Sequence, residues 1–162
     1  MHDSLLDVFF RLGAATLAGM LLGLNRDLRG KPTGIRTLGL VSLGVAIATV
    51  AVLRTPQAMG FEDAYSRLLQ GIVQGVLTGI GFLGGGVILH SKHAVHNLTT
   101  AATVWVTAAI GIACAVASWP VLAIGLAFAA ILLALGDRVD KWIARQYGPM
   151  DDSEHDESRP QH

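Results

Sequence analysis

The sequence has few charged or aromatic residues and almost no cysteine. Of its 162 residues, 15% are charged, 6% are aromatic and one, Cys114, is a cysteine. A single cysteine excludes a disulfide framework and a cluster of thiolate ligands for a soft metal. The low charge, with a mean hydropathy of +0.52, excludes the surface of an ordinary soluble enzyme. The composition therefore predicts an integral membrane protein, with the lipid bilayer as its surroundings.

The sequence also has no excess of charge of one sign. Its 12 Lys and Arg residues balance its 12 Asp and Glu residues, which gives no reason to expect nucleic acid as a partner. Before the first apolar run stand Asp3 and Asp7 rather than lysines. A cleaved signal peptide would begin with basic residues and end at a small-residue cleavage site. We therefore expect the first apolar run to be a retained helix.

Long apolar runs are the main feature that is present. About 20 apolar residues are needed for a helix to cross a bilayer. The runs that approach or exceed this length are Leu5–Leu24, Ile35–Leu53, Leu68–Leu89, Leu98–Ser118 and Pro120–Gly136. They predict an all-α, polytopic membrane fold with five transmembrane helices, contained in one domain over residues 1–136. Trp119 and Pro120 separate the last two runs, so we expect these to form a tight hairpin.

The basic residues alternate between loops and predict the orientation. The loop between the first two runs, the loop between the third and fourth, and the segment after the fifth carry most of the Lys and Arg residues. These residues are Arg26, Arg29, Lys31, Arg36, Lys92, Arg138, Lys141 and Arg145. Because basic loops stay in the cytoplasm, we expect a multi-pass protein of the bacterial inner membrane, with its N-terminus outside and its C-terminus in the cytoplasm.

The residues after the fifth run have a different composition. Residues 137–147 could form an amphipathic interfacial stub, with Val139, Trp142 and Ile143 on one face. The acidic segment 148–162 has almost nothing to bury, so we expect it to be a disordered tail.

Small residues recur at four-residue spacing in three of the runs. Gly19 and Gly23 form such a ridge on the first run, and Gly71 and Gly75 on the third. The fourth run carries a corresponding row of threonines that begins at Thr99. Such ridges let transmembrane helices approach closely, and a simple packing seam is one interpretation of them.

A polar row accompanies the glycines of the third run and favours a second interpretation. Gln70, Gln74 and Thr78 lie one turn apart. An amide in hydrocarbon costs several kcal/mol when it has no partner. We therefore expect this row to face other helices or a hydrated cleft, and a functional cleft is the alternative to a seam.

The segment 79–86 contains glycines at positions 79, 81, 84, 85 and 86. Glycine weakens a helix by up to about 1 kcal/mol relative to alanine. The segment is therefore a candidate for a broken or kinked helix of the kind found at transporter sites, and close helix contact is the alternative. It lacks the strand and the Gly-Lys-Ser/Thr sequence of a phosphate-binding loop.

Two groups of charged residues are candidates for ion pairs. Asp7 and Arg11 are one helical turn apart and can neutralise each other. Asp27 stands among the four cations of the first basic loop. We expect it to be ionised and paired with Arg36 or another base of that loop. The alternative is an ordinary basic loop with no special network.

The sequence offers no clear metal or catalytic site. His90, His93 and His96 are three residues apart, but no carboxylate or thiol stands beside them. The dense carboxylates all fall in the segment 148–162, where a flexible chain would make a poor Mg²⁺ site. No nucleophile, base and orienting group stand together on a plausible scaffold. We therefore expect no cofactor, no bound metal and no enzymatic activity.

Two motifs resemble the signatures of the MgtC/SapB family. The first comprises residues 23–27 (GLNRD), 30–37 (GKPTGIRT), Leu40 and Val41; the second comprises residues 79–88 (GIGFLGGGVI), 95–98, 99–102 (TTAA) and Trp105. The likeness covers about residues 5–136. Asn25 stands where an acid is frequent in the family. We expect no soluble C-terminal domain of the kind that longer members carry, which places the chain near the short SapB-like members.

The resemblance implies an inner-membrane protein for adaptation to low magnesium and for virulence-type stress survival. It also implies a regulator of a membrane partner such as ATP synthase, whereas a transporter or channel for magnesium or another ion is the alternative. Small-residue ridges are also compatible with a homo-oligomer. The motifs and the charge pattern together nominate the functional residues Arg26, Asp27, Arg36, Thr37, Gly79, Gly81, Gly84, Gly85, Gly86, Thr99 and Thr100.

Overall fold

A computed structural model describes residues 5–55, 62–89 and 97–147. They form the helices α1 (Leu5–Asp27), α2 (Ile35–Leu53), α4 (Glu62–Leu89), α5 (Leu98–Ala115) and α6 (Trp119–Tyr147). Each of the five contains a stretch long and apolar enough to cross a membrane. For the described residues, the predicted all-α class and the five helices long and apolar enough to span a membrane are therefore confirmed.

The helix bounds differ from the predicted runs mainly at the ends. The predicted run 35–53 coincides with α2, whereas α4 begins at Glu62 instead of residue 68. The fifth helix runs without interruption from Trp119 to Tyr147. Residues 137–147 thus continue α6 as helix. The predicted tail, residues 148–162, and the three histidines at positions 90, 93 and 96 lie outside the described residues.

Of the two interpretations of the glycine-rich segment, a broken helix is wrong. Residues 79–86 are helical throughout and belong to an α4 that continues to Leu89. Each glycine costs a helix up to about 1 kcal/mol. A break within the bilayer would instead leave several backbone groups unpaired, at several kcal/mol each. An unbroken helix is therefore the cheaper solution.

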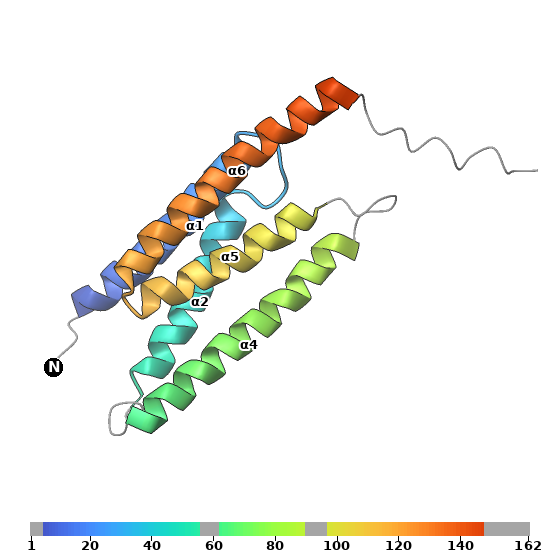
Figure 1. The fold of residues 1–162 in the computed structure, drawn as a ribbon. Helices are drawn as coiled ribbons and strands as arrows, with labels where there is room; N and C mark the ends of the chain where they lie inside the picture. The colour runs from blue at the N-terminus through green and yellow to red at the C-terminus, as the bar shows by residue number, and fades with distance from the viewer. Residues whose placement is uncertain (1–4, 56–61, 90–96, 148–162) are drawn as a thin grey trace, which may run out of the picture. The chain divides into compact units, whose positions relative to one another are not determined.

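The chain divides into two compact units, residues 1–129 and 130–162. In the first unit, α1 packs against α2 and α5, and α4 packs against α5 and α2. Figure 1 shows α5, in yellow, running alongside α4, in green. The described part of the second unit is the remainder of α6.

Glycines let α2 lie in close contact with two neighbours. A Cβ atom added at Gly19 of α1 would come within 2.5 Å of the Leu38 carbonyl oxygen and 2.9 Å of the Ser42 Cβ. A Cβ atom at Gly111 of α5 would come within 2.6 Å of the Ser42 carbonyl oxygen. Helices α1 and α5 therefore both approach α2 at backbone distance near Ser42, and this close packing fixes the relation of the three helices.

Candidate functional site

The side chain of Arg26, in the last turn of α1, is buried with 1% of its surface exposed. Its Nε and Nη2 donate hydrogen bonds to the Pro32 carbonyl oxygen at 3.0 and 2.9 Å. Nη2 also donates to the Thr100 Oγ1 at 2.6 Å, and Nη1 to the Thr103 Oγ1 at 3.3 Å. One guanidinium therefore joins the end of α1, the following loop and the first turns of α5.

Neutral oxygens hold this buried cation. Among the described side chains, no carboxylate forms an ion pair with Arg26. The Thr103 hydroxyl donates its own proton to the Thr99 carbonyl oxygen at 2.6 Å, which leaves its lone pairs for the guanidinium. Hydrogen bonds to a charged group contribute roughly 1.5–3 kcal/mol each, so several of them can offset much of the cost of burying the charge. The arrangement depends on both threonines of α5 and on the path of the loop.

Asp27, the last residue of α1, accepts a hydrogen bond from the backbone N–H of Ile35 at 2.8 Å. Ile35 is the first residue of α2, and its N–H is one of the donors that a helix leaves unpaired at its start. The carboxylate also lies favourably at the positive end of the α2 dipole. A side chain at Gly34 would overlap this carboxylate. Asp27 therefore caps α2 from outside the helix, and glycine at position 34 makes room for it.

Asp27 was expected to pair with Arg36 or another base of its loop, and the pairing with Arg36 is wrong. Arg36 is exposed, and these two described residues form no ion pair with each other. The loop turns back through positive φ angles of 62° at Gly30 and 60° at Thr33, which brings the first N–H of α2 onto the carboxylate. Arg36 follows Ile35, and successive residues of a helix point about 100° apart.

The predicted functional residues divide into three groups. Arg26, Asp27 and Thr100 belong to one cluster, which we call the Arg26 junction: Arg26, Asp27, Pro32, Ile35, Thr100 and Thr103. Arg36, Thr37 and Thr99 are exposed. The α4 glycines 79, 81, 85 and 86 have open space at the Cβ position, whereas Gly84 is buried against the Ala101 Cβ at 3.5 Å.

Thr103 and Pro32 belong to the junction although sequence reasoning did not nominate them. A signal for Thr103 was present, because it follows Thr100 by three residues and so shares its helix face. The contribution of Pro32 is a backbone carbonyl, which no residue pattern reveals.

The predicted packing glycines also behave differently from one another. A Cβ atom at Gly23 would come within 2.6 Å of the Ile35 backbone, and Gly19 is equally tight against α2. At Gly71 and Gly75 of α4, no heavy atom of the described residues lies within 4 Å of the Cβ position. Gly19 and Gly23 therefore pack within the chain, whereas Gly71 and Gly75 meet no described residue.

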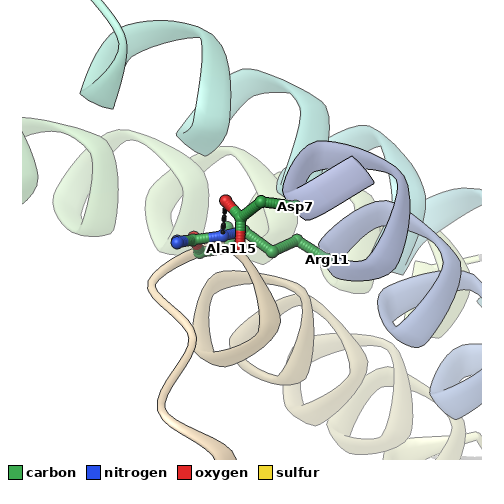
Figure 2. Close-up of polar contacts among 3 residues, drawn as sticks. All are labelled: Asp7, Arg11 and Ala115. Carbon is green, nitrogen blue, oxygen red and sulfur yellow. Dashed lines mark hydrogen bonds and ion pairs between the residues drawn. The ribbon is translucent and has the colours of Figure 1, made fainter. Parts of the chain in front are cut away.

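The opposite end of α1 carries a second charged contact, shown in Figure 2. The Arg11 Nε donates to the Asp7 Oδ2 at 2.7 Å, which confirms the predicted ion pair. Its Nη1 donates to the Ala115 carbonyl oxygen, at the end of α5, at 2.6 Å. These residues line a cavity of about 250 Å³ together with Arg54 and Tyr65. An arginine thus ties each end of α1 to α5.

Comparison with known proteins agrees with this architecture. The family model described as "MgtC family" matches residues 12–142. The chain is 36% identical to the SrpB protein of Synechococcus elongatus, over 88% of this chain and 82% of that protein. It is 31% identical to the SapB protein of Bacillus subtilis, over 88% of this chain and 60% of that protein. It is 38% identical to "Putative magnesium transporter YhiD" of Escherichia coli, over 65% of this chain and 49% of that protein.

SapB and YhiD are thus considerably longer than the part of each that matches this chain. No solved structure matches the chain. The match to the family model covers most of the five helices, including the residues that tie α1 to α5 at the Arg26 junction, Arg26, Thr100 and Thr103. The chain therefore belongs to the MgtC family and is a multi-pass membrane protein.

Proposed function

We propose that this chain is a non-enzymatic regulator in the bacterial inner membrane that acts in adaptation to low magnesium and in virulence-type stress survival. It would do so by binding another membrane protein within the bilayer. The resemblance to the MgtC/SapB family nominates ATP synthase as that partner. Membership of the MgtC family supports the assignment to this physiological setting.

The observation that carries the proposal is the unused glycine face of α4. Gly71, Gly75 and Gly79 follow one another at four-residue spacing, and nothing in the described residues approaches their Cβ positions within 4 Å. Transmembrane helices associate through small residues of this kind, because their backbones can then approach closely. Since Gly19 and Gly23 of α1 are already occupied by α2, we place the docking surface on α4.

Replacing Gly75 by leucine tests the proposal. We expect Gly75→Leu to abolish co-purification of the partner from native membranes and to reduce growth in low magnesium, because the added side chain keeps a second helix at a distance. Gly44→Leu is the matched control. Gly44 is also an exposed helical glycine with open space at its Cβ position, but it lies on α2. Unchanged co-purification by Gly75→Leu, at equal abundance in the membrane, would contradict docking through α4.

A second candidate function is ion transport, which the printed name of the relative YhiD suggests for that protein. The polar side chains Gln70, Gln74 and Thr78 on α4 favour it here, because polar groups can line an ion path. Purified protein in liposomes loaded with a magnesium-sensitive dye tests it. Flux above that of empty liposomes, under a gradient and an imposed potential, would support transport, whereas the absence of flux would remove this candidate.

The proposed location includes an orientation, with the N-terminus outside and the basic loop of the Arg26 junction in the cytoplasm. A reporter that is active only in the periplasm should give signal when it is fused after Ala58. Fusions after Lys31, Lys92 or Met150 should remain dark. A signal after Met150 would contradict the proposed orientation of the last helix.

A further inference from the structure

Helix α4 carries polar side chains that nothing in the described chain satisfies. Gln70, Gln74 and Thr78 are exposed on a helix that is long and apolar enough to cross a membrane. Their side chains have no hydrogen-bond partner among the described residues. An unpaired amide in hydrocarbon costs several kcal/mol. In a bilayer, this row therefore requires a covering surface that supplies hydrogen-bonding groups.

The threonines of α5 form a polar row whose hydroxyls are hydrogen-bonded within the same molecule. Thr100, Thr103 and Thr107 are buried, and each hydroxyl takes part in a hydrogen bond. The row on α4 differs in two respects, because its side chains are exposed and have no hydrogen-bond partner in the part of the chain that the structure describes. It therefore behaves as one half of an interface rather than as part of the core.

We propose that this face of α4 binds the same face of a second copy of this chain. We call it the α4 polar face and define it by Gln70, Gly71, Gln74, Gly75 and Thr78. A primary amide both donates and accepts hydrogen bonds, so each glutamine is complementary to its own counterpart. Two copies inserted in the same orientation have equal residues at equal depth. A two-fold axis along the membrane normal then places the same residues opposite one another.

The glycines make the required distance attainable. Gly71 and Gly75 have the four-residue spacing that permits a close, right-handed crossing of two transmembrane helices. Arg67 is exposed on the same side of α4 and would meet its own counterpart in such a pair. It lies about 12 Å along the helix axis from Gly75, and crossed helices diverge with distance from the crossing point. The two like charges are therefore kept apart.

This inference rests on the proposed function, because both assign an occupant to the same face of α4. The second copy covers the face in the absence of a target, and a target helix must displace it. Self-association is a property of the chain alone, whereas regulation also needs the partner. The two can therefore be tested separately.

Cysteine cross-linking of the purified chain in liposomes that contain no other protein tests the interface. The natural sequence has one cysteine, Cys114, which is buried and supplies the background. We expect Thr78→Cys to give a disulfide-linked dimer on mild oxidation, with at least about ten times the yield of the exposed control Gly44→Cys. Equal yields from the two variants, or no dimer from Thr78→Cys, would overturn the proposal.

Energy transfer between labelled copies in the same liposomes measures the contribution of the amides. The double variant Gln70→Leu/Gln74→Leu should weaken self-association by about tenfold, the scale expected for a few interhelical hydrogen bonds. The control Leu17→Ala, at an exposed position of α1, should associate as the wild type does. Association of the double variant at wild-type strength would overturn the role of the α4 polar face. If the wild type is monomeric but still co-purifies with its target, the proposed binding of a second copy is overturned and the proposed function stands.

Discussion

Helices α1 and α4 carry the same glycine pattern and use it in opposite ways. A Cβ atom added at Gly19 or Gly23 of α1 would lie 2.5–2.6 Å from the backbone of α2, whereas one added at Gly71 or Gly75 of α4 would meet no atom of the described residues within 4 Å. The spacing alone therefore does not reveal whether a seam is internal or faces another molecule. What decides is whether a neighbouring backbone in the same chain reaches the glycine.

The largest effect should follow from adding a side chain at a glycine of α1 that packs against α2. Gly23→Leu would place a side chain against the backbone of Gly34 and Ile35. Backbone cannot move as a flexible side chain does, so we expect a loss of about 3 kcal/mol or more and reduced assembly. Thermal unfolding of the purified protein in detergent measures this loss. Gly75→Leu is the comparison, with a change below about 0.5 kcal/mol, and equal destabilisation of both variants would break the contrast between the two helices.

The next effect concerns the guanidinium that connects α1 to α5. Arg26→Met removes four hydrogen bonds, to the Pro32 carbonyl and to the hydroxyls of Thr100 and Thr103. Because the lost interactions outweigh the relief of the buried charge, we expect a loss of about 2 kcal/mol. Faster tryptic cleavage after Arg29 in the adjacent loop would report the same change.

Arg26→Lys distinguishes the hydrogen-bond geometry from the charge. A lysine keeps the charge but lacks the planar fork that reaches three acceptors, so it should recover only part of the stability. Full recovery by lysine would mean that charge rather than geometry holds the junction.

A smaller effect should appear at the cap of α2. Gly34→Ala places a Cβ on the Asp27 carboxylate and displaces it from the Ile35 N–H, for which we expect a cost of about 1 kcal/mol. Asp27→Asn keeps an acceptor oxygen and should cost less. Growth in low magnesium at equal membrane abundance should follow the same order.

The charge swap Asp27→Arg with Arg36→Asp provides the control. Since Asp27 and Arg36 form no ion pair with each other, we expect no rescue by the swap. Restored growth would mean that the two residues are paired in the membrane.

The smallest effect is expected at Ser42, where α1 and α5 both reach α2. The Ser42 Oγ is buried and, among the described residues, has no hydrogen-bond partner. Ser42→Ala removes a polar atom that is not satisfied there, so stability should be unchanged or rise by up to about 1 kcal/mol. A loss above about 1 kcal/mol in the same detergent unfolding assay would show that the hydroxyl has a partner in the folded protein.

The sequence allowed the helices to be predicted better than the contacts between them. Apolar runs locate spans because the bilayer fixes their length, and α2 matched its prediction at both ends. For the glycine-rich end of α4 the sequence left a break open, because low helix propensity suggests one. In lipid, the need to pair backbone groups outweighs that propensity.

Within the candidate site, residue types allowed the members of the cluster to be predicted, but not their hydrogen-bond partners. Arg26, Asp27 and Thr100 were nominated and do lie in one cluster. The acceptors of Arg26 include a backbone carbonyl, and the donor to Asp27 is a backbone N–H. Contacts to the backbone depend on how the loop turns, which residue types and spacing do not specify. Arg36 was one expected partner of Asp27, and that pairing was wrong for this reason.

The two arginine contacts of α1 also determine when the packing of this helix can be completed during synthesis. Arg26 finds Thr100 at a separation of 74 residues along the chain, and Arg11 finds the Ala115 carbonyl at a separation of 104. Both partners belong to α5, which leaves the ribosome long after α1 has entered the membrane. Until then, neither guanidinium has its α5 acceptors, and α1 can settle against α2 but cannot be fixed at either end. A nascent chain that stops before α5 therefore lacks the contacts that hold both ends of its first helix.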